Sequence, residues 1–297
     1  MAMTASTASA PRPVRVRSSA WWTVPCAVVA AVPVVFAATV WFAQHSLLYH
    51  PDRDPVPPAD EVLPGARDVE LTTADGLTLG AWYLPPSGAC TAVVLVAHGN
   101  AGNRARRAGL ARAIQARGFG VLLMDYRGYG GNAGRPTEAG LALDVRAART
   151  YLLEEAGVAE RDLVYLGESL GTGVVTELAV EHPPAALVLR SPLSTLGEAG
   201  NALYRMPVSL LLRERYLVRE HVGRLRVPTA VVYGTTDVIV RAEHSRQVAE
   251  AARAAGAHVV EVEVTATGHA DERLVHGDEL MDALVAVAVR GGVTGCW

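Results

Sequence analysis

The sequence predicts an α/β fold, with a mostly parallel sheet covered by helices on both faces. Short apolar runs alternate with helix-patterned segments, several runs are apolar at every position, and polar residues of catalytic type follow directly after the runs. Such an alternation implies right-handed crossovers and therefore a parallel sheet. In sheets of this kind, functional residues collect at the carboxyl ends of the strands.

The predicted domain covers residues 67–291. Alternating apolar residues on both sides of Asp75-Gly76 indicate two antiparallel strands at one edge of the sheet. The uniformly apolar runs are typical of strands buried on both faces. These strands are expected at residues 92–97, 120–124, 163–166, 185–189, 229–233 and 259–264. Helices are expected at residues 105–117, 137–155, 170–181, 242–255 and 278–289.

One long insertion, residues 191–227, separates two of the predicted strands. It is expected to form a small lid, because several of its leucines could give it an apolar underside. A short apolar lid favours hydrophobic acyl substrates. The alternative is that these side chains simply pack onto the domain.

Charge and composition exclude several classes of function. The net charge is −3 and the pI is about 6.3, which disfavours nucleic acid as a partner. Every cationic side chain is an arginine, so Ser-Lys dyads, Schiff-base chemistry and lysine-containing phosphate loops are excluded. No cofactor or metal is expected, and the oligomeric state is left open.

The three cysteines are Cys26, Cys90 and Cys296. They are an odd, scattered set without Cys-x-x-Cys spacing, so neither a zinc site nor a disulfide framework is expected from them. The redox compartment stays open on this basis.

Residues 20–43 form an uncharged apolar stretch behind a short arginine-containing tail, residues 1–19. As a helix this stretch would extend about 36 Å, enough to cross a hydrocarbon core of about 30 Å. We therefore expect a transmembrane helix, a cytoplasmic tail before it and the large domain outside the cytoplasm. The alternative is a signal peptide cleaved near Ala37, with a secreted domain. Residues 44–66 are proline-rich and predict an extended, stiff linker.

The residues Gly167-Glu168-Ser169-Leu170-Gly171 lie between a predicted strand and a predicted helix. A serine at such a sharp turn adopts a strained backbone conformation, and the glycines on either side avoid collisions with neighbouring elements. Ser169 is therefore the predicted nucleophile. By itself the pattern also fits an ordinary glycine-rich turn.

A serine nucleophile needs a general base and a group that orients the base. His269 follows the last predicted strand, and Asp237 follows the strand before it. Both are therefore expected at the same end of the sheet as Ser169, in the chain order serine, acid, histidine. Asp125 also ends a strand but precedes the serine, so we interpret it as a carboxylate that braces a loop.

Backbone N–H groups are expected to stabilise the oxyanion that forms when the serine attacks. Leu170 directly follows the nucleophile, and Asn100 lies in the loop after the strand that ends at Ala97. We expect these two residues to form the oxyanion hole. His98, in the same loop, is interpreted as a structural hydrogen-bonding residue and not as a second base.

Residues 67–291 resemble the α/β-hydrolase superfamily. The sequences His98-Gly99-Asn100-Ala101-Gly102-Asn103 and Asp125-Tyr126-Arg127-Gly128-Tyr129-Gly130 are similar to those of the membrane-anchored α/β-hydrolase domain-containing serine hydrolases, which share a linker like Leu48-Tyr49-His50-Pro51. The resemblance implies a Ser169, Asp237 and His269 triad and an esterase, lipase or thioesterase activity. Ala270 is a mild departure, since family members often carry a polar residue there.

Two motifs point elsewhere and are rejected. Gly128-x-Gly130-x-x-Ala133 matches a dinucleotide fingerprint, but Pro136 interrupts it and no helix opens on it; a His-Glu-x-x-His zinc motif is absent. The predicted substrate is a small acyl ester or thioester. The alternatives left open are a serine peptidase that uses the same triad and a catalytically silent, membrane-anchored binding module.

Overall fold

The computed structural model describes residues 23–297, and the predicted cytoplasmic tail lies outside them. The chain divides into two compact units, residues 1–42 and 43–297. The described part begins with helix α1 (Thr23–Leu48). In the part of the chain that the structure describes, none of the helices combines the length and apolar character that a membrane crossing requires. The anchor at residues 20–43 begins outside the described residues and stays a prediction.

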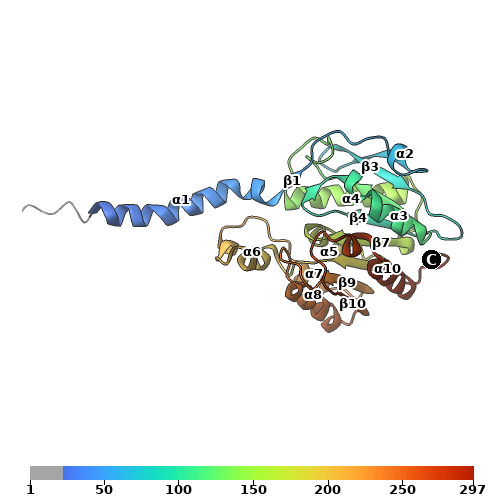
Figure 1. The fold of residues 1–297 in the computed structure, drawn as a ribbon. Coiled ribbons are helices and arrows are strands. Elements are labelled where there is room, and N and C mark those ends of the chain that lie inside the picture. Colours follow the sequence, from blue (N-terminus) through green and yellow to red (C-terminus); the bar gives the residue numbers. More distant parts are fainter. Residues whose placement is uncertain (1–22) are drawn as a thin grey trace, which may run out of the picture. The chain divides into compact units, whose positions relative to one another are not determined.

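The larger unit is built on an eight-stranded sheet with the order β10-β9-β8-β7-β4-β6-β3-β2 (Figure 1). The strands are β2 (Arg67–Thr72), β3 (Thr78–Leu84), β4 (Val93–Ala97), β6 (Gly120–Met124), β7 (Leu163–Glu168), β8 (Ala186–Arg190), β9 (Thr229–Gly234) and β10 (Val259–Val264). Strand β2 pairs antiparallel with β3, and β3 antiparallel with β6, while all other pairs are parallel. The predicted mostly parallel sheet with an antiparallel edge is confirmed.

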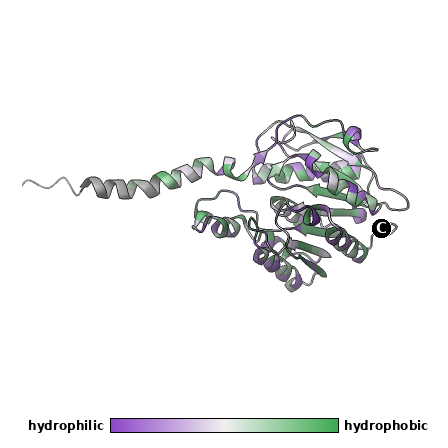
Figure 2. Cartoon of the chain, viewed as in Figure 1, coloured by the Kyte–Doolittle hydropathy of each residue, from purple (hydrophilic) through white to green (hydrophobic). Residues whose placement is uncertain are grey.

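Helices cover both faces of this sheet, and each face buries its own apolar core (Figure 1). One face carries α4 (Glu138–Glu154), α5 (Leu170–Glu181), α7 (Val218–Val222) and α8 (Ala242–Ala254). The other carries α2 (Ala59–Val62), α3 (Ala108–Ala116), α9 (Glu272–His276) and α10 (Asp278–Arg290). Figure 2 shows the central strands mostly in the hydrophobic colour, as expected of strands enclosed on both sides. The sheet is therefore a rigid platform whose strand ends position the connecting loops.

The predicted lid, residues 191–227, is named here the cap segment. It contains α6 (Leu196–Tyr204), the 3₁₀ turn η3 (Val208–Leu210) and α7. The last part is integral to the domain: Val218 and Val222 are completely buried, and Tyr216 lies against Gly173 of α5 so closely that a Cβ there would be 2.5 Å from the ring. In the first part, by contrast, several large apolar side chains are exposed, namely Leu203, Tyr204, Met206 and Leu210.

The predicted linker, residues 44–66, lies against the domain in the structure. Strand β1 (His50–Pro51) pairs in parallel with β5 (Ala101–Gly102), and Ala59 of α2 is completely buried. Proline content predicts stiffness, but it does not show which surface a stiff segment contacts. The pairing with β5 makes this segment part of the folded unit.

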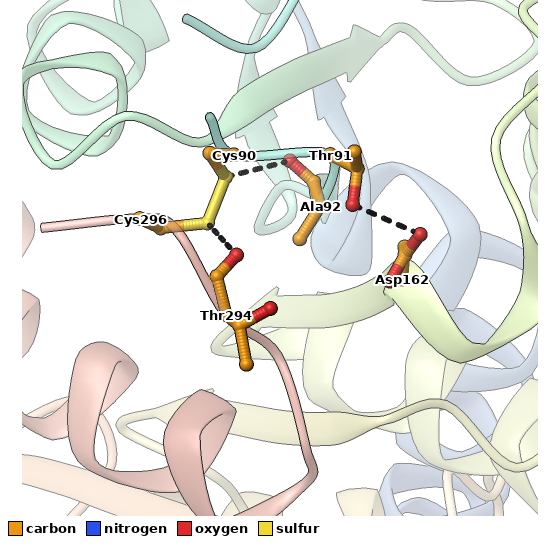
Figure 3. Close-up of a disulfide and its surroundings, with 6 residues drawn as sticks. All are labelled: Cys90, Thr91, Ala92, Asp162, Thr294 and Cys296. Carbon is orange, nitrogen blue, oxygen red and sulfur yellow. Dashed lines mark hydrogen bonds between the residues drawn. A yellow bond between two sulfur atoms is a disulfide. The ribbon is translucent and has the colours of Figure 1, made fainter. Parts of the chain in front are cut away.

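A disulfide joins Cys90 to Cys296, with their Cα atoms 4.6 Å apart (Figure 3). The expectation that the cysteines imply no disulfide is therefore wrong. Cys90 directly precedes β4, and α10 brings the end of the chain back to the same, amino-terminal edge of the sheet. A separation of 206 residues gave no sign of this proximity.

Candidate active site

Ser169 lies at a sharp turn between β7 and α5, with φ 51° and ψ −115°. This left-handed backbone conformation is unfavourable for a residue with a side chain, and it persists only where the surroundings enforce it. A Cβ on Gly167 would lie 2.7 Å from the Gly171 carbonyl oxygen, and one on Gly171 would lie 2.1 Å from the Ala97 carbonyl oxygen. The strained serine turn predicted from the two glycines is thus present, and we call residues 167–171 the serine turn.

Asp237 and His269 form a hydrogen-bonded pair at the ends of neighbouring strands. Asp237 follows β9 and His269 follows β10, and these strands run in parallel. The distance from His269 Nδ1 to Asp237 Oδ2 is 2.7 Å. Because an ionised carboxylate can only accept, Nδ1 carries the hydrogen, which leaves Nε2 as an acceptor in the neutral ring. This is the tautomer that a general base requires.

The carboxylate of Asp237 is held in its charged form. Burial raises the pKa of Asp237, but the hydrogen bond and charge of His269 and the N–H groups of Val240 and Ile239 together bring its pKa below the ordinary value. Both of these N–H groups lie 2.9 Å from Oδ1, the oxygen that His269 does not use. Asp237 is therefore an oriented anion with both oxygens occupied.

Ser169 lies at the same edge of the sheet, at the end of β7, and Arg190 connects the two sides. The Ser169 N–H donates to the Arg190 carbonyl oxygen at 2.9 Å, and Arg190 Nη1 donates to the His269 carbonyl oxygen at 2.9 Å. Ser169 Oγ makes no hydrogen bond to any residue that the structure describes. The structure thus joins Asp237 to His269 directly, whereas it connects Ser169 to the histidine loop through Arg190.

Glu168, directly before Ser169, is completely buried between two arginines. Its carboxylate accepts from Arg107 Nε at 3.0 Å and from Arg190 Nε at 3.2 Å. Burial opposes ionisation, but the charges of Arg190 and Arg107 and the hydrogen bond from Arg107 lower the pKa of Glu168 to about 2. Sequence reasoning missed this cluster; the only local signal was an acidic residue inside an apolar strand, which requires buried partners.

The loop after β4, residues 98–103, lies beside the serine turn and is named here the β4 loop. A Cβ on Gly99 would be 3.5 Å from Ser169 Cβ, so Gly99 lies directly against Ser169, and Asn100 is the next residue of the loop. Leu170 is the first residue of α5, where a helical N–H has no intrahelical partner. Of the two residues predicted as oxyanion donors, Leu170 directly follows Ser169 and Asn100 directly follows Gly99, which lies against Ser169.

His98 and Asp125 have structural partners. His98 Nδ1 donates to the Gly99 carbonyl oxygen at 2.7 Å, as expected of a structural hydrogen-bonding residue. Asp125 accepts from the backbone N–H of Arg104 at 2.7 Å and from its guanidinium at 2.6 Å. It therefore braces the segment that follows the β4 loop, in agreement with its interpretation from the sequence.

Exposed apolar side chains flank the acid. Val238 and Ile239, directly after Asp237, are 75% and 49% exposed.

No group of three or more His, Cys, Asp or Glu side chains in the described part of the chain is arranged to hold a metal ion.

Comparisons with known proteins agree with this geometry. The sequence profile of the family "Serine aminopeptidase, S33" matches residues 88–216. An esterase of Pyrococcus furiosus superposes with a TM-score of 0.68, over 82% of this chain and 98% of that chain, at 22% identity. A Mycobacterium tuberculosis protein described as uncharacterized is 44% identical over 271 residues, 91% of this chain and 95% of its own length. The chain belongs to the α/β-hydrolase superfamily.

A relative of this α/β hydrolase has a stated activity. The lysophosphatidylserine lipase ABHD12 of Danio rerio is 26% identical over 225 residues, which cover 62% of this chain and 58% of that protein. Within the superfamily, the strained serine turn and the serine-peptidase profile make this α/β hydrolase a serine hydrolase.

Proposed function

We propose that this α/β hydrolase cleaves carboxylic esters or thioesters through an acyl-enzyme on Ser169. Ser169 Oγ attacks the acyl carbon while His269 Nε2 takes the hydroxyl proton, and the N–H groups of Leu170 and Asn100 stabilise the oxyanion. When the tetrahedral intermediate collapses, the alcohol or thiol leaves with the proton from His269. Water then repeats the sequence, releasing the carboxylic acid and restoring the serine.

One observation carries this proposal: an oriented imidazole and a strained serine occupy the same end of one sheet. The pair of His269 and Asp237 at 2.7 Å prepares a base whose Nε2 bonds to no described residue. Ser169 follows β7, which lies two places from β9 and three places from β10 in the sheet. A closure of the histidine loop toward the serine turn when substrate binds would complete the contact, since catalytic hydrogen bonds are often long in unliganded enzymes.

The decisive experiment is labelling with a fluorophosphonate probe, which reacts with activated serines. Wild-type protein and the Ser87→Ala variant, which changes an exposed serine far along the chain from the site, should both be labelled. Ser169→Ala should not be labelled and should lose at least about 10³-fold in kcat. Folded wild-type protein that resists labelling would favour the catalytically silent binding module.

The substrate class proposed is a hydrophobic acyl ester or thioester. Exposed apolar side chains next to Asp237 and on the cap segment support it, because an acyl chain could be desolvated against them. The lysophosphatidylserine lipase among the relatives supports the same class. Values of kcat/KM for nitrophenyl esters should rise from acetyl to octanoyl chains; a steady fall with chain length would contradict the proposal.

A serine peptidase is the second candidate, and the family profile that matches residues 88–216 favours it. The same triad would cleave an amide, so the site alone does not separate the two activities. Matched ester and amide substrates with an identical acyl group separate them. An ester hydrolase should show kcat/KM at least about 10³-fold higher on the ester, whereas comparable values would identify a peptidase.

We also propose that the domain works outside the cytoplasm, either on a membrane anchor at residues 20–43 or after cleavage near Ala37. The disulfide of Cys90 and Cys296 supports this location, because such bonds persist in oxidising compartments. Denatured protein taken from cells without reduction should bind one PEG-maleimide, at Cys26, and three after reduction. If the N-terminal segment has been cleaved, the protein should bind no PEG-maleimide before reduction and two after it. Binding of three PEG-maleimide groups without reduction would refute the proposal.

A further inference from the structure

The residues that connect α1 to the domain make direct hydrogen bonds to Asn100, the proposed oxyanion donor. The His50 N–H donates to the Asn100 carbonyl oxygen at 2.9 Å, and Asn100 Nδ2 donates to the Leu48 carbonyl oxygen at 2.8 Å. Residues 48–52 are named here the connector. Asn100 is thus held at its backbone carbonyl and at its side chain by the same five-residue connector.

The connector continues along the β4 loop as a short strand. His50 is in register with Ala101 and Pro51 with Gly102, and the Asp52 N–H donates to the Gly102 carbonyl oxygen at 3.2 Å. On its other side, the Asp52 carbonyl oxygen accepts from the Gly130 N–H at 2.8 Å. The connector therefore lies between two loops that follow strands β4 and β6.

The connector is itself fixed to the domain core. The Tyr49 side chain is buried, and its hydroxyl lies 2.7 Å from the hydroxyl of Tyr216. Tyr216 packs in turn against Gly173 in α5, the helix that begins at the serine turn. At the connector's outer end, Arg106 pairs with Asp52 at 3.3 Å. A displacement of the connector would therefore have to break buried contacts.

The orientation of one peptide group depends on these contacts. The peptide between Gly99 and Asn100 carries the proposed donor N–H. His98 Nδ1 donates to the carbonyl oxygen of this peptide, which belongs to Gly99. The connector binds the carbonyl oxygen of the following peptide, which belongs to Asn100. Tyr129 Oη also donates to the Asn100 carbonyl oxygen, at 2.8 Å. An oxyanion donor is effective only if it is aimed before the charge develops.

We propose that the connector is a positioning element of the active site, which aims the Asn100 N–H through its hydrogen bonds to Asn100. This inference rests on the proposed hydrolase function. The N-terminal segment is then required for the rate of the chemical step, in addition to any part it has in location. Leu48 is the last residue of α1, so a change at the end of that helix acts directly on Asn100.

The test removes the contacts of His50 to Asn100 in the full chain, namely its N–H bond and the longer contact of its ring with Asn100 Nδ2 at 3.4 Å. His50→Pro deletes the N–H that binds Asn100, while the matched control Arg53→Pro places a proline nearby in the same segment, at an N–H that bonds to no described residue. On a nitrophenyl ester, His50→Pro should lower kcat by about 10-fold to 100-fold with KM within about 3-fold, since loss of a whole donor costs about 10² to 10³. Arg53→Pro should retain wild-type kcat.

A second readout separates positioning from a general structural effect. A trifluoromethyl ketone forms a hemiketal oxyanion on the serine, so its affinity for His50→Pro should fall by the same factor as kcat/KM. Unchanged kcat and affinity in a folded variant would overturn the inference. If His50→Pro does not fold, the Asn100→Ala variant provides the test, because it removes the hydrogen bond to Leu48 but keeps the donor N–H. A kcat of Asn100→Ala equal to that of the wild type would overturn the inference.

The proposed function fails separately from this inference. An Ser169→Ala variant that remains active would refute the proposed nucleophile. If Ser169→Ala is inactive and His50→Pro has the kinetics of wild type, the proposed function stands and only the positioning role is lost.

Discussion

The two sides of the candidate site are held by different forces. Ser169 is fixed by close packing, because Gly167 and Gly171 leave no room for a Cβ and the serine itself is forced to φ 51°. On the other side, His269 is fixed by hydrogen bonds, from its own ring to Asp237 and from Arg190 to its carbonyl oxygen. Changes to the serine side should therefore affect folding and rate together, and changes to the histidine side should affect mainly rate.

The largest effect is expected on the histidine side. In Asp237→Asn the amide can donate to Nδ1 and favour the wrong tautomer, so kcat should fall by about 10³ to 10⁴. The melting temperature should change by only a few degrees, because asparagine keeps an oxygen that can accept from the Ile239 and Val240 N–H groups. Steady-state kinetics and thermal unfolding of the same preparation check both parts, with Asp282→Asn, at an exposed position of α10, as control. A loss of activity below about 10-fold would contradict the role of Asp237.

The packed side is probed by adding one methyl group. Gly171→Ala would place a Cβ 2.1 Å from the Ala97 carbonyl oxygen, so either the turn or β4 must move. We expect a loss of at least about 10² in kcat, with a lower yield of folded protein. The matched control is Gly268→Ala next to His269, where a Cβ would meet nothing within 4 Å. This variant should lower kcat by less than about 3-fold. If Gly171→Ala and Gly268→Ala lowered kcat equally, the serine side would not be more tightly packed than the histidine side.

The disulfide provides a contrast to both sides of the site, because it lies at the amino-terminal ends of the strands, whereas the site lies at their carboxyl ends. Replacing both Cys90 and Cys296 by serine should reduce the free energy of unfolding by about 3 kcal/mol, mainly because the unfolded chain loses its constraint. At a temperature where the variant is folded, kcat should stay within about 2-fold of wild type. Denaturant unfolding with and without a reductant measures the first effect; the reductant should destabilise the wild type and leave the variant unchanged.

The smallest effect is expected at Glu168, which lies between the two sides. Its pKa falls from the ordinary 4.5 to about 2 on folding. A carboxyl group whose pKa falls stabilises the fold above its unfolded pKa, and this contribution is lost as the pH falls toward the folded value. Between pH 6 and pH 3 the wild type should lose about 2 kcal/mol that Glu168→Gln does not lose.

The control for that measurement is Glu155→Gln, which changes an exposed carboxylate at the end of α4. Its free energy of unfolding should follow that of the wild type at each pH. If Glu168→Gln also follows the wild type down to pH 3, the buried carboxylate does not carry the proposed acid sensitivity.

The sequence predicted the positions of the candidate site that depend on local patterns, and the catalytic roles of these residues stay predictions. Ser169 could be found because two glycines and the flanking strand and helix lie within a few residues of it. Asp237 and His269 could be found because each directly follows a strand, and parallel strands end together. The hydrogen bond between them agrees with the expectation that an acid orients the histidine.

The remaining contacts could not be predicted, since they join distant parts of the chain. The two arginines around Glu168 come from a turn after β4 and from the end of β8, and apolar periodicity carries no information about their directions. The pairing of residues 50–51 with 101–102 and the disulfide depend likewise on where a loop or a chain end returns. Such contacts are set by the tertiary fold.

The bond between Cys90 and Cys296 closes residues 90–296 into a covalent ring that contains Ser169, Asp237 and His269. A protease that cuts this ring once leaves both pieces attached, so the nicked enzyme keeps its mass on a non-reducing gel. Among the residues that the structure describes, α1, the connector, α2 and the antiparallel strands β2 and β3 lie on the open arm before the ring. Digestion of that arm would release fragments and detach the connector, while the ring with the three proposed catalytic side chains stayed whole.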